Sequence, residues 1–148
     1  MQKTQNKFIL SPFNMSDLTA GLGNLWLNSS NYIYNTWRGI YEGYGNLIQQ
    51  LDTARVLGAE LLLWGVYTND DNFDNNVWMR AAVFGERMWS TTSLPTYEIV
   101  ASIVALQRTL EEAGVDVAPI TSEYCEYKPQ ICWPSTNSEI HSFDIQTQ

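Results

Sequence analysis

The feature that most restricts the fold is the run VLGAELLLW at residues 56–64, where apolar side chains fill consecutive positions apart from Gly58 and Glu60. A strand with one face in water alternates apolar and polar residues, whereas a strand inside a parallel sheet is apolar on both faces. The run therefore predicts a parallel strand buried on both faces. It ends at Trp64, and a loop rich in Asp, Asn and Thr follows Val66, so that an aromatic side chain opens onto a polar loop.

The other expected elements alternate with this strand. Residues 7–11 predict a short buried strand stopped by Pro12, and 36–51 carries apolar residues at helical spacing. Two more helices are expected at 76–89 and 96–113, the second ended by Gly114. The side chains expected to face inward are Val77, Trp78, Ala81, Phe84 and Met88 in the first of these and Ile99, Ile103, Val104, Leu106 and Leu110 in the second. This order predicts an α/β fold with parallel strands, although two strands do not form a stable sheet on their own.

Composition and charge exclude several classes of protein. With 45% apolar and 16% charged residues, the 148-residue chain is expected to be a folded globule rather than a disordered chain. A formal net charge of −8 would repel phosphate backbones, so nucleic acid is not an expected partner. No stretch reaches the roughly 18 apolar residues that a transmembrane span needs. The N-terminal MQKTQNKFIL lacks the charged-then-apolar order of a signal peptide.

Two features nevertheless favour a secretory or lysosomal setting. Cys125 and Cys132, the only cysteines, lie close together in EYCEYKPQICW, where a disulfide would close a short loop. Asn14 and Asn28 each begin an Asn-x-Ser pattern that accepts N-linked glycans. Marks of export without an export signal lead to the expectation that the chain is the C-terminal part of something longer.

Metal, cofactor and triad chemistry are not expected. Asp70, Asn72 and Asp74 have the opening spacing of a calcium loop, but the turn glycine and the bidentate Glu of that loop are both replaced. These side chains are better suited to shaping the loop and capping the next helix. His141 is the only histidine, and it has no nearby cysteine or serine partner for zinc or triad chemistry.

The segment VLGAELLLWGVYTNDDNFDNNVWMRAAVFGERMWS, residues 56–90, resembles the last barrel strand, loop and helix of the β-N-acetylhexosaminidases of glycoside hydrolase family 20. LG-x-E, LWG, an Asn/Asp loop, W-x-RA and ERMWS follow one another in register. KFILSP is similar to the preceding barrel strand, NTWRGIYE to the Trp-bearing segment after it, and EYCEYKPQIC to the closing disulfide loop of the family. The resemblance covers roughly residues 8–132 and is closest to the insect members.

The resemblance implies the last two strand–helix units of a TIM (β/α)8 barrel plus a C-terminal helix, which is an incomplete barrel. Residues 1–133 would be the C-terminal portion of the catalytic domain, and 134–148 a polar, disordered tail. Glu60 inside the apolar run would be costly unless it were paired, and Arg80 or Arg87 on the following helix are its expected partners.

The chemistry implied by the resemblance needs groups that this chain lacks. Family members release a terminal N-acetylhexosamine, using the acetamido oxygen of the substrate as nucleophile. A Glu protonates the leaving oxygen while the Asp before it orients the acetamide and offsets its developing charge. No Asp-Glu dipeptide occurs in the sequence. The acid and its partner would come from a missing N-terminal barrel portion or from a partner chain.

Several positions match substrate-binding positions of the family. Trp64 corresponds to a tryptophan that walls the acetamide pocket, and Asp17 to an acidic residue after the preceding strand. Val66 stands where relatives carry a Glu that binds sugar hydroxyls. Either Asn14 or Met15 stands where relatives carry a tyrosine that holds the acetamido oxygen. These replacements predict a degenerate site.

Two classes of function follow. The first is a β-N-acetylhexosaminidase fragment that supplies one wall of a subsite for N-acetylhexosamine-containing glycans or chitooligosaccharides. The second is a diverged or truncated, catalytically silent homologue that binds glycans or a protein. Val66 and the lost tyrosine favour the second class for this chain, whereas the density of motifs favours the first for its lineage.

Overall fold

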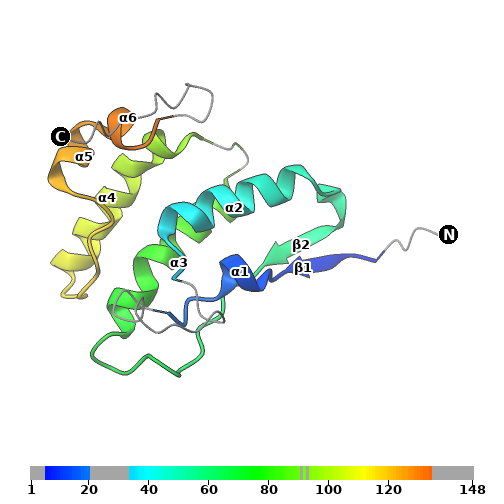
Figure 1. The fold of residues 1–148 in the computed structure, drawn as a ribbon, viewed down its shortest axis with the longest axis horizontal. Coiled ribbons are helices and arrows are strands. Elements are labelled where there is room, and N and C mark those ends of the chain that lie inside the picture. Colours follow the sequence, from blue (N-terminus) through cyan, green and yellow to red (C-terminus); the bar gives the residue numbers. More distant parts are fainter. Residues whose placement is uncertain (1–5, 21–33, 91, 93, 135–148) are drawn as a thin grey trace, which may run out of the picture.

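The computed structural model describes residues 6–20, 34–90, 92 and 94–134. The elements in chain order are β1 (Phe8–Leu10), α1 (Phe13–Ser16), α2 (Trp37–Gln49), a 3-10 turn (Thr53–Arg55), β2 (Val56–Ala59), α3 (Phe73–Trp89), α4 (Thr96–Glu112), α5 (Glu123–Tyr127) and α6 (Pro129–Cys132). Figure 1 shows α2 running along the two strands, with α4, α5 and α6 at the opposite end of the molecule.

The two strands are parallel neighbours, as the sequence predicts for an α/β fold. Their register pairs Phe8 with Val56 and Leu10 with Ala59, and it shifts by one residue between Phe8 and Ile9. A parallel pair needs a long crossover connection, and here the crossover contains α2. β1, α2 and β2 therefore form one β-α-β unit, the repeating unit of larger parallel sheets.

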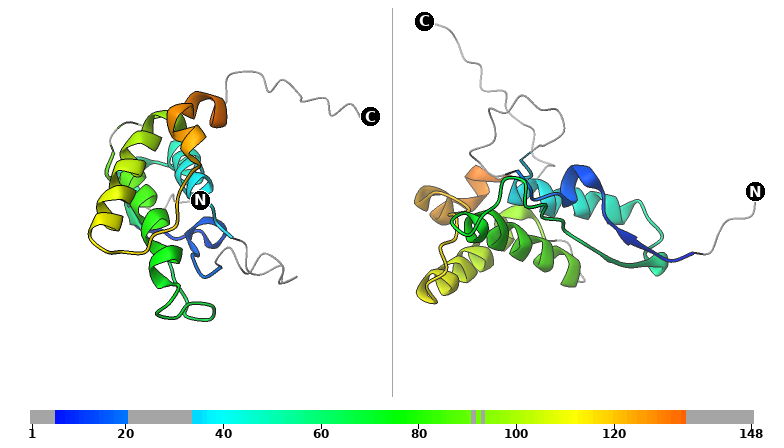
Figure 2. Two further views of the ribbon diagram at one scale, coloured as in Figure 1. Left: turned by 90° about the vertical axis from the view of Figure 1, so that its left-hand side faces the viewer. Right: turned by 90° about the horizontal axis from the view of Figure 1, so that it is seen from below.

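Only one face of this sheet is buried, so the prediction of a strand buried on both faces is wrong for this structure. The buried face packs against α2 and forms a hydrophobic cluster, the strand cluster, whose buried members are Leu10, Leu18, Ile40 and Tyr44. On the other face Ile9 is 59% exposed and Leu57 64% exposed. Apolar residues follow one another along the strand, but within the described residues a helix covers only the side on which α2 lies (Figure 2).

A second cluster, the helical cluster, fills the space between α2, α3 and α4. Its buried residues are Tyr41, Met79, Val83, Ile99, Val100, Ile103, Val104, Val117 and Ile120. The expected inward positions Ile99, Ile103 and Val104 of α4 belong to it. Leu106, also expected to face inward, is instead 38% exposed.

The expected apolar stripe of α3 is also corrected. The helix begins at Phe73, three residues earlier than predicted, and buries Met79 and Val83 rather than Trp78, which is 41% exposed. The cause is that α3 packs against both α2 and α4. Met79 and Val83 enter the helical cluster, while Phe84 and Met88 contact the strand cluster. A helix with two partners buries two faces, and one stripe does not describe it.

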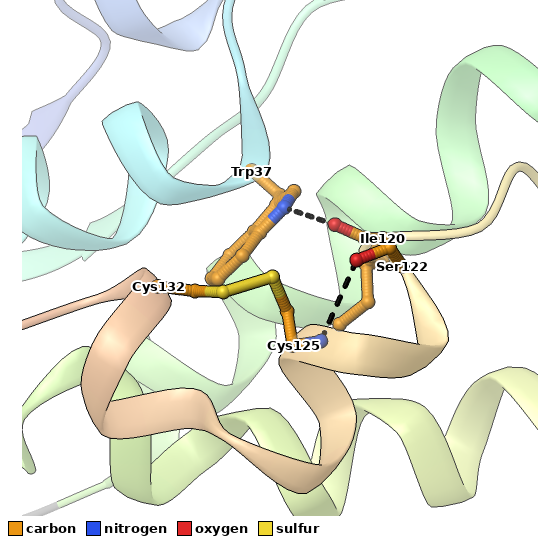
Figure 3. The surroundings of a disulfide bond; sticks show 5 residues. All are labelled: Trp37, Ile120, Ser122, Cys125 and Cys132. Atoms are coloured by element: carbon orange, nitrogen blue, oxygen red, sulfur yellow. Dashed lines mark hydrogen bonds between the residues drawn. A yellow bond between two sulfur atoms is a disulfide. The ribbon is translucent and has the colours of Figure 1, made fainter.

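The C-terminal helices are held by the expected disulfide. Cys125 of α5 and Cys132 of α6 are joined, with their Cα atoms 5.7 Å apart. Figure 3 shows this bridge beside Trp37, whose indole Nε1 donates to the carbonyl oxygen of Ile120 at 2.9 Å. The ring of Trp133 meets that of Trp37 edge to face, with centroids 5.5 Å apart. Residues 123–133, called the disulfide unit below, are thereby packed onto the first turn of α2. Among the described residues, no helix combines the length and apolarity that crossing a bilayer requires.

Candidate functional site

The site lies at the carboxyl ends of β1 and β2, where the backbone pairing continues past both strands. The amide of Leu62 donates to the carbonyl of Ser16, and the amide of Leu18 donates to the carbonyl of Leu62, both at 2.8 Å. Asp17 and Leu62 thus form a parallel bridge. The carboxyl ends of parallel strands are where α/β proteins place their ligands, because loops from neighbouring strands meet there.

Asp17 is held from two sides at this end. Its carboxylate Oδ1 accepts from the amide of Thr19 at 2.8 Å, and its carbonyl accepts from Asn35 Nδ2 at 2.8 Å. Only 6% of the residue is exposed. The side chain therefore has one orientation, fixed by the turn that follows it.

Trp64 lies across from this turn, with its side chain 60% exposed. Its backbone amide donates to Thr19 Oγ1 at 3.0 Å. The structure thus brings Asp17 and Trp64 to neighbouring strand ends and connects them through Thr19. A flat aromatic face that is partly open to water can pack against the apolar face of a sugar ring, while a carboxylate can accept from its hydroxyls.

The three positions predicted to be degenerate lie around this site. Val66 is 59% exposed, and its amide donates to the carbonyl of Trp64 at 2.8 Å, so it follows the tryptophan in a tight turn. On α1, Asn14 is exposed, whereas Met15 packs into the strand cluster, with its sulfur against Gly43 of α2. None of these three side chains is a carboxylate or a phenol.

Arg80 binds the turn that carries Asp17, a role that the sequence does not predict. The residue is 4% exposed, and its guanidinium donates to the carbonyls of Leu18 at 2.8 Å and of Ala20 at 3.1 Å. Burial lowers the pKa of Arg80 below its ordinary value, and the nearby Tyr34 and Asp17 act in the opposite direction. The W-x-RA motif contains this arginine but does not predict its acceptors, because these carbonyls belong to a segment about sixty positions away.

The expected pairing of Glu60 with Arg80 or Arg87 is wrong. Glu60 is exposed, so its carboxylate is hydrated and needs no buried cation. Its backbone carbonyl accepts from the Tyr44 hydroxyl at 3.0 Å. Arg87 instead lies against Gly45 of α2, with its guanidinium carbon 5.8 Å from the ring centre of Tyr41.

The polar loop before α3 is closed by its own side chains. Asn69 Oδ1 accepts from the amides of Asp71 and Asn72, and Asn72 Oδ1 accepts from the amide of Asn69 at 2.9 Å. Asp74 accepts from Trp78 Nε1 at 2.6 Å. Across the described ranges, no three His, Cys, Asp or Glu side chains are grouped as a metal ion would require.

Of the two glycosylation patterns, only the one at Asn14 lies within the described residues. Asn14 is exposed, but Ser16 of the same pattern is fully buried, and its hydroxyl bonds that of Tyr44 at 2.6 Å. Asn28 lies outside the described residues, as do His141 and the tail from 135 onward.

Comparison with known proteins identifies the family. Residues 1–92 match the family model described as glycosyl hydrolase family 20, catalytic domain. A chitooligosaccharidolytic beta-N-acetylglucosaminidase of Bombyx mori is 25% identical over 130 residues, covering 86% of this chain and 22% of that protein. The probable beta-hexosaminidase fdl of Drosophila melanogaster is 27% identical over 67% of the chain and 16% of its own length. Beta-hexosaminidase subunit beta of Rattus norvegicus is 32% identical over 62% of the chain and 18% of its own length.

The chain spans about a fifth of the length of these curated relatives. The resemblance of residues 56–90 to the family is confirmed, since the family model matches the greater part of the chain and includes this segment. The parallel β-α-β unit, with candidate sugar-binding residues at its carboxyl end, agrees with the TIM barrel of that catalytic domain. On these grounds the chain belongs to glycosyl hydrolase family 20.

Proposed function

We propose that this chain is the C-terminal part of a β-N-acetylhexosaminidase that removes terminal N-acetylhexosamine from glycans or chitooligosaccharides. The observation that carries the proposal is the placement of Trp64 and Asp17 at neighbouring strand ends, joined through Thr19. In this role Trp64 packs against the acetamide and sugar ring, and Asp17 accepts hydrogen bonds from the substrate. The incomplete barrel ends here as one wall of a sugar subsite.

The chemical step needs a general acid and an aspartate that orients the acetamide, and no Asp-Glu dipeptide occurs among the 148 residues. A further portion of the barrel, in the same polypeptide or in a partner chain, supplies both. The coverage of only about a fifth of the relatives' length supports this division. By itself the chain is expected to have no hexosaminidase activity.

A second candidate function is a catalytically silent homologue that binds a glycan or a protein. Val66 beside Trp64 favours it, because valine accepts no hydrogen bond from a sugar hydroxyl. Each hydroxyl left unpaired in a binding pocket would cost about 1–3 kcal/mol. With Asn14 or Met15 replacing the family tyrosine as well, two sugar contacts are lost.

The experiment compares the full-length natural protein with the isolated 148-residue chain. The intact mass of the protein from its source, set against 16.9 kDa for this chain, shows whether further sequence accompanies it. Turnover of a chromogenic N-acetylglucosaminide is then measured for both. We expect turnover by the longer protein and none by the chain alone.

Trp64→Ala should abolish most of the activity of the longer protein, whereas Trp89→Ala is the matched control, since Trp89 is 91% exposed at the end of α3. Turnover by the isolated chain that Trp64→Ala removes would overturn the division of the site. A longer protein that binds N-acetylglucosamine without turnover would establish the silent alternative.

The catalytic portion is proposed to extend to residue 133, with 134–148 as a separate tail. The contact between Trp37 and Trp133 supports this boundary, because it packs the end of the disulfide unit onto α2. A secretory or lysosomal location is also proposed. The disulfide supports it, since such bonds persist in oxidising compartments. A mass shift on treatment with an N-glycosidase would test the location and the two Asn-x-Ser sites together.

A further inference from the structure

The buried Arg80 donates hydrogen bonds to one carbonyl in its own helix and to three outside it. Its Nε donates to the carbonyl of Asn76 in its own helix at 2.7 Å, which fixes the side chain against α3. Its two terminal nitrogens then donate to Leu18, Ala20 and Asn35, the last at 3.4 Å. All four acceptors are backbone carbonyls. A guanidinium is planar and always charged, so it suits several carbonyls in one plane better than a lysine does.

The acceptors surround the candidate site. Leu18 and Ala20 flank Thr19, the residue that accepts from the amide of Trp64 and donates its own amide to Asp17. The same turn is bound on its other side by the pairing of Leu18 with Leu62. The turn 17–20 is therefore held between the end of β2 and the guanidinium on α3.

Arg87 shows that this arrangement is not a general property of buried arginines in α3. It lies seven positions further along the same helix and is 6% exposed, close to the 4% of Arg80. It lies against Gly45 and the ring of Tyr41, and its Nε has no hydrogen-bond acceptor among the residues that the structure describes. Of these two arginines, Arg80 is the one that donates hydrogen bonds to the turn that carries Asp17.

We propose that Arg80 is a positioning residue for the sugar-binding end of the sheet. It holds the turn 17–20 against β2, and through Thr19 it keeps the Asp17 carboxylate and the Trp64 indole in one relative placement. Its effect on sugar binding rests on the proposed function, whereas its effect on the turn does not.

The first test is hydrogen exchange of the full-length natural protein with the substitution Arg80→Lys, which keeps the charge but cannot reach the same set of carbonyls. Arg87→Lys is the matched control. Exchange in peptides covering 15–20 and 61–66 should rise about tenfold or more in the Arg80 variant, the factor expected from loss of one hydrogen bond to a charged group. The same peptides should be unchanged in the Arg87 variant. Equal exchange in the two variants would overturn the proposal.

The second test measures binding of N-acetylglucosamine. Arg80→Lys and Thr19→Val should both raise the Kd about tenfold, since a displaced contact loses its directional energy, whereas Arg87→Lys should leave it unchanged. Thr19→Val breaks the hydrogen bond to the Trp64 amide without altering a buried charge. If the Arg80 variant fails to fold, an unchanged Kd in the Thr19 variant would overturn the proposal, because the turn is proposed to act on Trp64 through Thr19. Faster exchange with an unchanged Kd would contradict the positioning role. A wild-type protein that does not bind the sugar would refute the proposed function, and the exchange measurement would still decide the role of Arg80.

Discussion

At the residue scale, the hydroxyl of Tyr44 in α2 makes hydrogen bonds to two other parts of the chain. The ring is fully buried in the strand cluster, and the hydroxyl is shared between Ser16 at 2.6 Å and the carbonyl of Glu60 at 3.0 Å. It therefore links α1, α2 and the chain just beyond β2. Tyr44→Phe should lower the free energy of unfolding by about 1–3 kcal/mol, because the buried Ser16 hydroxyl and the partly buried carbonyl of Glu60 lose this partner.

Denaturant unfolding at neutral pH measures this loss. Tyr127→Phe is the control, since that ring is 72% exposed and its hydroxyl should contribute no more than about 0.5 kcal/mol. A Tyr44 variant as stable as the control would mean that water replaces the hydroxyl without cost.

The same tyrosine makes stability depend on alkaline pH. Burial raises the pKa of Tyr44 above its ordinary value, and the nearby Glu60 acts in the same direction, against the bond from Ser16. Since the folded state holds the proton more tightly, the contribution is fully present below about pH 10, the unfolded pKa, and is lost as pH rises through the folded pKa. Burial likewise raises the pKa of Tyr41.

Unfolding curves taken from about pH 8 to 11 should show wild-type stability falling at the upper end of this range. Tyr44→Phe should show a shallower fall, with a remaining slope from Tyr41. A variant with the wild-type slope would assign the alkaline loss to other groups.

Sequence reasoning placed Trp64 and Asp17 at the candidate site through their motifs, and the structure brings them together. It did not predict the role of Arg80, because charges in a sequence suggest partners of opposite charge. The guanidinium instead finds carbonyls of Leu18 and Ala20, and every residue of a chain carries a carbonyl. Such acceptors leave no trace in the sequence, whereas a glutamate inside an apolar run predicts a cationic partner that the exposed Glu60 does not need.

At the scale of elements, α4 is the helix whose packing the sequence predicts best. It contacts α2, α3, α5 and α6, but its buried Ile99, Ile103 and Val104 all belong to the helical cluster and recur at helical spacing. The predicted buried face of α3 is less accurate because this helix packs into two clusters. A single apolar stripe therefore omits the buried Met79 and Val83. The predicted bounds of α2 and α4 agree with the structure within about two residues, the scatter usual for helix ends.

Ile99→Ala tests the packing of α4 against its neighbours. Ile99 is 1% exposed, and its removal leaves a cavity in the helical cluster, so the variant should be destabilised by about 2–5 kcal/mol. Leu106→Ala in the same helix should cost less than about 1 kcal/mol, since a side chain that is already partly in water leaves little cavity. Denaturant unfolding of the two variants measures the difference. Equal losses would place Leu106 in a buried contact.

The disulfide unit gives a second prediction at this scale. Cys125 and Cys132 are seven positions apart, and closing so short a loop stabilises the folded state by roughly 2–3 kcal/mol in the chain-entropy view. Cys125→Ser with Cys132→Ser should lower stability by about that amount. It should also increase exchange of the Trp37 indole, which lies beside the bridge and donates to Ile120 (Figure 3). An unchanged stability would mean that the other contacts of α5 and α6, with α4 and through Trp37 and Trp133, hold the two helices without the bridge.

At the scale of the whole molecule, the sheet is open where its family has a closed barrel. Each of the two strands has a single partner among the described residues, and the face away from α2 presents Ile9 and Leu57 to water. The sequence anticipated this conflict, since a strand apolar on both faces belongs inside a larger sheet. Among the described residues, no helix lies on that face. Exposed strand edges with apolar side chains favour association with other chains.

Leu57→Lys should have opposite effects in the isolated chain, where this face of the sheet is open, and in a longer protein, where the proposed barrel covers it. In the isolated 148-residue chain, light scattering after gel filtration should detect less self-association for this variant than for wild type, because the open face becomes charged. In the full-length protein the same lysine would lie inside the proposed barrel, where an unpaired charge is costly, so the variant should lose about 3 kcal/mol or more of stability. Ile131→Lys is the matched control, since both side chains are 64% exposed and Ile131 lies on α6, away from the strands. If Leu57→Lys were as harmless as Ile131→Lys in the full-length protein, this face of the sheet would be open to water there as well, and the barrel proposed here would not close over it.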